Sequence, residues 1–233
     1  MTDLFNPFIL FIAAMAGGLA VFLFKTTDES KLKLLISFSG AYLLAICLLH
    51  LIPEIYEGNS TDIGMFILGG FFLQVMLEFL SGGIEHGHMH VHKKHLNVVP
   101  VAIMVSLCVH ALTEGMPLGG EGLAHRHSTL VVGIVLHKMP IAFVLMAFMM
   151  QAKIAKPKAI AVLITFALMA PLGIMLGETV AAFMSIEELL AIVVGIFLHV
   201  STTILFESTD NHRFNIHKII IIIFGASLAF INL

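Results

Sequence analysis

Two short segments of this sequence place histidine and glutamate inside long apolar runs. The first reads Val-His-Ala-Leu-Thr-Glu-Gly-Met-Pro and contains His110 and Glu114; the second reads His-Lys-Met-Pro-Ile-Ala-Phe and contains His137. Because His110 and Glu114 are four residues apart, they share one face of a helix. Imidazole nitrogens and a carboxylate oxygen suit Zn²⁺ and also tolerate Fe²⁺, Mn²⁺, Co²⁺ or Cd²⁺. These three side chains therefore form a candidate divalent-metal site.

The composition indicates that lipid is the solvent for most of the chain. Of the 233 residues, 59% are hydrophobic and only 12% are charged, and the mean hydropathy is +1.02. A soluble domain has about 25% charged residues, so too few charges are present to cover a water-exposed surface. The net charge of −3 gives no indication of nucleic-acid binding. Cys47 and Cys108 lie in apolar runs and are interpreted as buried small hydrophobes.

Eight apolar runs each come near the ~20 residues that a helix needs to cross a bilayer. Most connections between them are short, which favours antiparallel neighbours in a helix bundle. We therefore predict an all-α polytopic membrane protein with eight transmembrane helices in a single transporter-like domain over residues 1–233. The predicted spans are 5–24, 32–52, 63–80, 97–117, 129–150, 159–181, 187–206 and 217–232.

The basic residues predict the orientation of the bundle. Arg126 is alone on one side and Lys138 lies within a span, whereas the other ten basic residues lie in alternate connections. The positive-inside rule places those ten in the cytoplasm, so both termini are predicted to be extracytoplasmic. A compact chain of this kind suits the inner membrane of a bacterium. The ten residues are Lys25, Lys31, Lys33, Lys93, Lys94, Lys153, Lys156, Lys158, Arg213 and Lys218.

Simple arithmetic places the candidate ligands at one depth. With a rise of ~1.5 Å per residue, His110 lies roughly 18–20 Å from the inner end of its span, and His137 lies roughly 12 Å from the outer end of the next. In a hydrocarbon core of ~30 Å these depths are similar. Ionisable residues inside a bilayer are costly, which favours a functional role. The alternative is that His110 and Glu114 only form a hydrogen bond within their helix.

Two further pairs of polar residues are candidates for an ion pathway. His50 and Glu54 are four residues apart at the outer end of the second span, and they form either an entrance site or a polar pair that ends a helix. His199 lies near the middle of the seventh span and is expected to line the pathway. Glu207 closes that span at the inner face, where it either contributes to the pathway or marks the helix end.

A histidine-rich loop over residues 82–96 is predicted on the cytoplasmic side. Alternating histidines are a compositional signal for metal binding, and a flexible loop suits ion capture, sensing or regulation. A weaker pair, His125 and His127, is predicted on the outer side. The loop histidines are His86, His88, His90, His92 and His95.

Taken together, these segments resemble the ZIP (Zrt/Irt-like protein) family of metal transporters over essentially the whole chain. The resemblance implies import of Zn²⁺ and related divalent ions into the cytoplasm, usually by a homodimer. It also implies an elevator motion in which spans one, four, five and six slide against spans two, three, seven and eight. The segments that carry it are His110-x-x-x-Glu114-Gly115, His137-Lys138-x-Pro140, Ala170-Pro171-Leu172-Gly173, Phe197-Leu198-His199-Val200-Ser201 and His50-Leu-x-Pro-Glu54.

The departures from the family pattern imply one metal position instead of two. In many members a second position uses Asn, Asp and Glu, and the matching residues here are Ala111, Lys138 and Ala170. The first position loses a carboxylate one turn beyond His137, where Ile141 stands. We therefore predict that the Lys138 ammonium occupies the place of the second metal.

Two other functions remain open on the sequence. An intramembrane zinc-dependent hydrolase would use the metal to activate water, with Glu114 as a base. The sequence contains no His-Glu-x-x-His helix, however, and no convincing Ser/His/Asp set. A metal-sensing membrane receptor would depend on the histidine-rich loop alone. The transporter interpretation predicts no catalytic residues.

Overall fold

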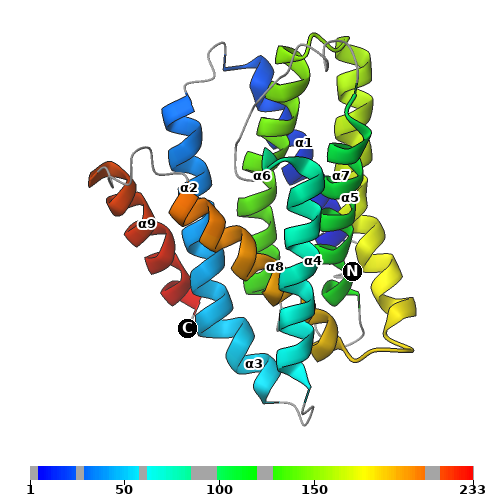
Figure 1. Cartoon of the computed structure of the whole chain (residues 1–233), viewed down its shortest axis with the longest axis vertical. Helices are drawn as coiled ribbons and strands as arrows, with labels where there is room; N and C mark the ends of the chain where they lie inside the picture. The colour runs from blue at the N-terminus through cyan, green and yellow to red at the C-terminus, as the bar shows by residue number, and fades with distance from the viewer. Residues whose placement is uncertain are drawn as a thin grey trace.

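The computed structural model describes residues 5–24, 29–57, 62–84, 99–119, 128–207 and 216–232. Every regular element in these ranges is helical, and the helices form one bundle (Figure 1). Within the described residues, seven helices are long and apolar enough to cross a membrane. The protein is therefore a polytopic helical membrane protein. These seven helices cover Phe5–Phe22, Leu32–Tyr56, Ile63–Ser81, Val101–Leu118, Ser128–Gln151, Lys156–Val180 and Ile186–Phe206.

The individual elements follow the predicted spans in order. Four of the predicted spans combine regular α-helix with a tighter or wider helical turn. In chain order the elements are α1 (Phe5–Leu19) with η1 (Ala20–Phe22), α2 (Glu29–Ile46) with the π-helical η2 (Cys47–Leu51) and α3 (Ile52–Tyr56), α4 (Ile63–Ser81), α5 (Val101–Gly115) with η5 (Met116–Leu118), α6 (Ser128–Gln151), α7 (Lys156–Val180), α8 (Ile186–Glu207), and α9 (Ile216–Leu228) with η7 (Ala229–Asn232).

The eighth predicted span is shorter than the others. Helix α9 has 13 residues, which rise only ~20 Å. The four residues of η7 add ~8 Å at the steeper rise of a 3₁₀-helix, so α9 and η7 together approach the ~30 Å thickness of a hydrocarbon core. Eight spans with both termini extracytoplasmic stay a prediction.

Prolines account for two differences between the predicted and observed boundaries. The fourth span was expected from residue 97, but residues 99 and 100 are not helical and α5 begins at Val101. Pro100 disfavours a helical conformation in the residue before it, and it occupies the N-cap position itself. The second span was expected to end at 52, yet it continues through Pro53 to Tyr56. The wider π-turn η2 covers Cys47–Leu51, the turn that precedes Pro53 and that the proline ring would otherwise crowd.

The outer surface of the bundle is apolar. Large hydrophobic side chains that point outward include Phe79, with 87% of its surface exposed, and Phe183, with 90%. A soluble protein rarely exposes contiguous apolar surface on this scale, whereas a lipid-facing surface requires it. The exposed faces therefore agree with an integral membrane protein.

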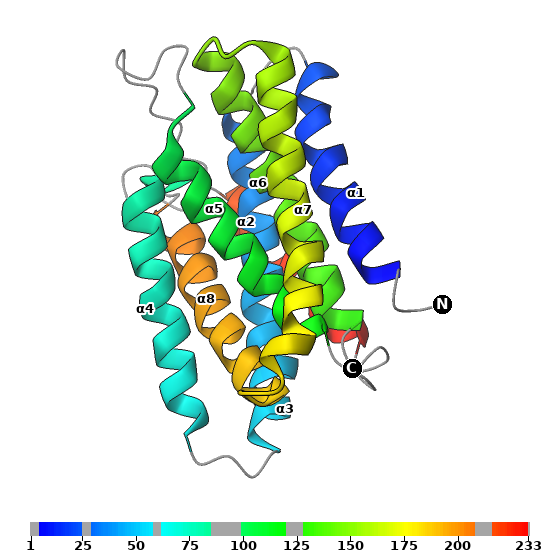
Figure 2. The same ribbon diagram turned by 90° about the vertical axis from the view of Figure 1, so that its right-hand side faces the viewer.

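The helices pack as two groups. In the first helix group, α1 packs against α6 and α7, and α5 packs against α7. In the second helix group, α4 packs against α8, and α2 packs against α8 and α9. Figure 2 shows α1 beside α7, and α4 beside α8. The two groups meet where α4 contacts α5 and where α2 contacts α6.

Candidate metal centre

The centre is built from one face of α5 and the facing turn of α6. His110 and Glu114 are one helical turn apart on α5, and both side chains are only 1% exposed. His137 comes from α6 and is also 1% exposed. The His110 and His137 rings lie edge to face with their centroids 6.0 Å apart. The two spans therefore bring together the three residues that the sequence placed at one depth.

The spacing of the three side chains is that of a ligand cluster. One nitrogen of each histidine and one oxygen of Glu114 all lie within 4.8 Å of one another. Nε2 of His110 is 3.0 Å from Oε1 of Glu114. Among the residues that the structure describes, no other set of three or more His, Cys, Asp or Glu side chains comes so close together. Two imidazoles and one carboxylate would leave a coordination position for water.

Lys138 lies beside this cluster and carries a buried positive charge. Its Nζ donates a hydrogen bond to Oε2 of Glu114 at 3.2 Å, and the side chain is 1% exposed. The ammonium also lies 5.0 Å from the centroid of the Phe166 ring on α7, a cation–π distance. Each carboxylate oxygen of Glu114 thus faces a different partner, His110 on one side and Lys138 on the other.

Apolar residues enclose the rest of the centre. Phe197 on α8 lies 6.5 Å from the His137 ring, measured between centroids. Ala111 and Ala170 are fully buried, and Ile141 is 3% exposed. None of these side chains offers a ligand atom. These three positions are therefore buried and apolar, and the charged group that pairs with Glu114 is the Lys138 ammonium.

Sequence reasoning missed a neighbour of His110. Gln74 on α4 is fully buried, and its Oε1 accepts a hydrogen bond from Nδ1 of His110 at 2.8 Å. Metal-binding histidines commonly donate their second ring N–H in this way. A glutamine in the middle of an apolar span was the available signal, because a buried amide needs hydrogen-bond partners.

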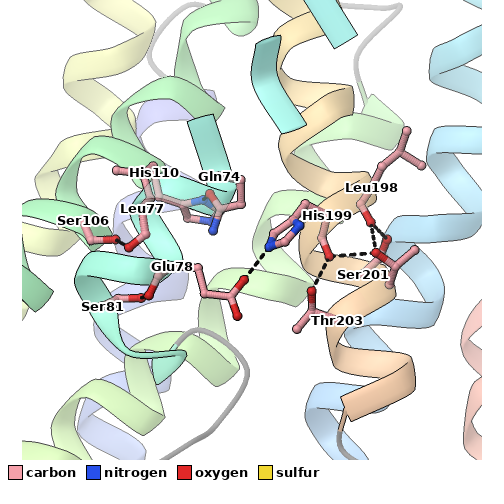
Figure 3. A network of polar contacts seen from close by, with 11 residues as sticks. Gln74, Leu77, Glu78, Ser81, Ser106, His110, Leu198, His199, Ser201 and Thr203 are labelled. Atoms are coloured by element: carbon pink, nitrogen blue, oxygen red, sulfur yellow. Dashed lines mark hydrogen bonds and ion pairs between the residues drawn. The ribbon is translucent and has the colours of Figure 1, made fainter. Parts of the chain in front are cut away.

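A second histidine–carboxylate pair lies in the other helix group. Nε2 of His199 on α8 pairs with Oε2 of Glu78 on α4, and these side chains are 13% and 22% exposed. Figure 3 shows this pair one helical turn along α4 from Gln74. The His199 ring also lies edge to face with Phe71, at 4.9 Å between centroids. Glu78 was not among the predicted pathway residues, although it lies four positions after Gln74 on the same helix face.

The other predicted pathway residues have separate surroundings. Nε2 of His50, in the π-turn η2, donates to the backbone carbonyl of Ala229 at 2.9 Å and thereby ties the second span to η7. Glu54 is half-buried in α3, and Glu207 is the last residue of α8. Their roles stay predictions. The loop histidines at 86, 88, 90, 92 and 95, and those at 125 and 127, lie outside the described residues.

Comparison with known proteins gives a consistent result. A family model described as ZIP Zinc transporter matches residues 83–232. The zinc transporter ZIP9 of Micropogonias undulatus is 27% identical over 124 residues, which cover 52% of this chain and 40% of that protein. The zinc transporter ZIP1 of Danio rerio is 25% identical over 190 residues, covering 61% and 63% respectively. Protein zntD of Dictyostelium discoideum is 26% identical over 152 residues, covering 58% and 22%.

The matches support a family assignment, but the relatives are covered only in part. The chain spans less than two thirds of the length of each of the three. The family match nevertheless covers more than half of this chain and includes both helices that carry the buried ligand cluster. With its apolar helical bundle, the chain belongs to the ZIP family of zinc transporters.

Proposed function

We propose that this protein transports divalent metal ions across the membrane, with Zn²⁺ as the main substrate and His110, Glu114 and His137 as its ligands. The observation that carries the proposal is the convergence of three buried ligand atoms within 4.8 Å. The relatives named above as zinc transporters support the same substrate. The family is one of transporters and not of enzymes, which removes the support for an intramembrane hydrolase.

The charges of the centre favour passage of one ion over storage of two. With neutral imidazoles, the Glu114 carboxylate and the Lys138 ammonium cancel, so a bound divalent ion adds two uncompensated positive charges. Lys138 supports a one-metal site, because its ammonium lies against the oxygen of Glu114 that a second ion would need. Such a site binds Zn²⁺ without the excess negative charge that would trap it. Two ions bound together in the core of α5 and α6 would refute this part of the proposal.

The packing supports alternating access by an elevator-type motion of the first helix group. All three ligands belong to α5 and α6, so the ion would travel with that group. Glycines hold the helices of this group at backbone distance: a Cβ on Gly115 would meet the carbonyl oxygen of Ala170, and a Cβ on Gly173 would meet that of Leu112. A rigid group that carries its own site is what an elevator motion requires.

Uptake into the cytoplasm, a homodimer and a bacterial inner membrane remain part of the proposal. The direction and the dimer follow from the resemblance to the family, and the relatives named above are eukaryotic. Fe²⁺, Mn²⁺, Co²⁺ and Cd²⁺ are further candidate substrates because imidazole and carboxylate ligands accept them.

The test is Zn²⁺ uptake into proteoliposomes by the wild type and by His110→Ala. We expect uptake by the wild type and its loss in the variant, because two remaining ligands hold the ion poorly. His217→Ala is the matched control, since His217 lies exposed on α9, away from the centre. Equal uptake by the wild type and His110→Ala would show that the ligand assignment is wrong. Zn²⁺ binding without uptake by the wild type would contradict transport itself.

A further inference from the structure

Gln74, in the second helix group, forms a hydrogen bond with a candidate ligand of the metal centre. It lies on α4, is fully buried, and faces His110 across the boundary between the groups (Figure 3). A buried amide at this depth is costly unless its polar atoms are bonded, so its position demands a partner on the neighbouring helix.

The hydrogen bond determines which nitrogen of His110 is available to a metal. The carbonyl oxygen of Gln74 can only accept, so Nδ1 of His110 carries the proton in this contact. In the neutral ring, Nε2 then presents its lone pair, and this is the nitrogen that lies 3.0 Å from the Glu114 carboxylate. Gln74 therefore holds the imidazole in the tautomer and the orientation that the centre requires.

The contact also depends on how α5 sits along α4. A hydrogen bond is lost within about 1 Å of displacement, and an elevator motion moves the first helix group much further than that. A second hydrogen bond joins these helices, from Oγ of Ser106 to the carbonyl of Leu77 at 2.7 Å. It crosses the same boundary but touches no ligand.

We propose that Gln74 is a positioning residue that couples the metal affinity of the centre to the position of the first helix group. The inference rests on the proposed function. With α5 seated against α4 as in this structure, Gln74 orients His110 and the centre binds its ion tightly. When the group slides, the bond breaks, the imidazole loses its fixed orientation, and the ion is released more readily.

The choice of an amide fits this role better than a carboxylate would. A neutral acceptor makes a weaker hydrogen bond than an ionised one, so the bond with Gln74 breaks at a lower cost during each cycle. A glutamate at this position would hold His110 more firmly and raise its basicity as a ligand. The protein would then bind its ion more tightly and transport it more slowly.

The test compares three variants in Zn²⁺ uptake and in binding of Co²⁺, whose visible absorption reports the ligand geometry. Gln74→Leu removes the acceptor at similar size, and we expect KM and the Co²⁺ dissociation constant to rise about tenfold or more with no loss of maximal rate. Gln74→Glu should lower both KM and the maximal rate. Ser106→Ala, the matched control, loses the other bond between α4 and α5 and should leave KM unchanged.

The outcomes separate this inference from the proposed function. Wild-type uptake combined with an unchanged KM in Gln74→Leu would overturn the role of Gln74 and leave transport standing. An equal rise in KM for Ser106→Ala would show that loosening of the interface, and not orientation of His110, is responsible. If the wild type binds Co²⁺ but transports nothing, the proposed function fails, and the Co²⁺ titration of Gln74→Leu still decides whether Gln74 orients the ligand.

Discussion

The two helix groups differ in how they are held together and in what they carry. Within each group, glycines bring helices to backbone distance, as where Gly173 on α7 faces the carbonyl of Leu112 and Gly70 on α4 faces that of Ile192. Between the groups, Gly133 on α6 faces side chains of α2 and no backbone atom, with Ile46 the nearest. Backbone contacts fix a geometry, whereas side chains can exchange rotamers. The boundary is therefore where the proposed elevator motion would slide the two groups past each other.

The polar residues divide along the same boundary. His110, Glu114, His137 and Lys138 form one buried cluster in the first helix group. The His199–Glu78 pair lies in the second helix group and is partly exposed. In the proposed elevator motion, a moving group that contains all three proposed ligands would carry an ion without exchanging ligands on the way. The fixed group would then need to offer only contacts such as Gln74.

The largest effect is expected from a valine inside the first helix group. In Gly173→Val the new Cβ would overlap the carbonyl oxygen of Leu112, and no side-chain rotation relieves a clash with backbone. We expect a loss of stability of about 4 kcal/mol or more, seen as a collapse in the yield of monodisperse protein in detergent. Gly69→Val is the control, because nothing lies within 4 Å of its Cβ on the exposed face of α4.

A stable Gly173→Val protein would contradict the rigidity assigned to the first helix group. The stability of Gly133→Ala, at the boundary, should lie between those of Gly69→Val and Gly173→Val. The reason is that the Ile46 side chain can move aside. If Gly133→Ala were as damaging as Gly173→Val, the boundary would be no softer than the interior of a group, and the sliding interface would lie elsewhere.

A smaller effect is expected from breaking the two polar pairs, Lys138–Glu114 and His199–Glu78. Glu114→Gln leaves the Lys138 ammonium at 1% exposure without its carboxylate, which should cost about 3–5 kcal/mol. Glu78→Gln removes a charge from the more exposed pair with His199 and should cost about 1 kcal/mol or less. Thermal unfolding of the purified proteins measures both.

A double variant distinguishes loss of charge pairing from loss of a ligand. Glu114→Gln combined with Lys138→Met should recover most of the stability, because no unpaired charge remains, but it should not recover Zn²⁺ uptake. Equal melting temperatures for Glu114→Gln and Glu78→Gln would show that the two pairs contribute equally to stability. The two helix groups would then not differ in this respect.

The sequence predicted the helical elements and the proximity of His110, Glu114 and His137 because both depend on local spacing. Apolar runs of about 20 residues are read directly as spans, and His110 and Glu114 share a helix face whatever the tertiary structure. The depth of His137 followed from counting residues along two antiparallel helices. The structure places these three side chains together in the way that this arithmetic requires.

What the sequence did not predict depends on which helices are neighbours. Gln74 lies 36 positions before His110, and Glu78 lies 121 before His199, so no local pattern joins either pair. The wide turn before Pro53 was likewise missed, because the sequence shows a proline but not how the preceding turn adapts to it. Each of these features is a tertiary contact or a response to one.

The smallest expected effect is a pH response that separates the two histidine sites. Ligand imidazoles must be unprotonated to bind metal, so uptake should fall severalfold as the pH is lowered from about 7.5 to about 5.5. If the centre is responsible, His199→Gln should keep the same acid decline, since His199 belongs to the other group. Zn²⁺ uptake measured across this range, with the pH equal on both sides, is the test. A flat wild-type profile would argue against histidine ligands, and loss of the decline in His199→Gln would move the proton-sensitive step from the centre to the His199–Glu78 pair.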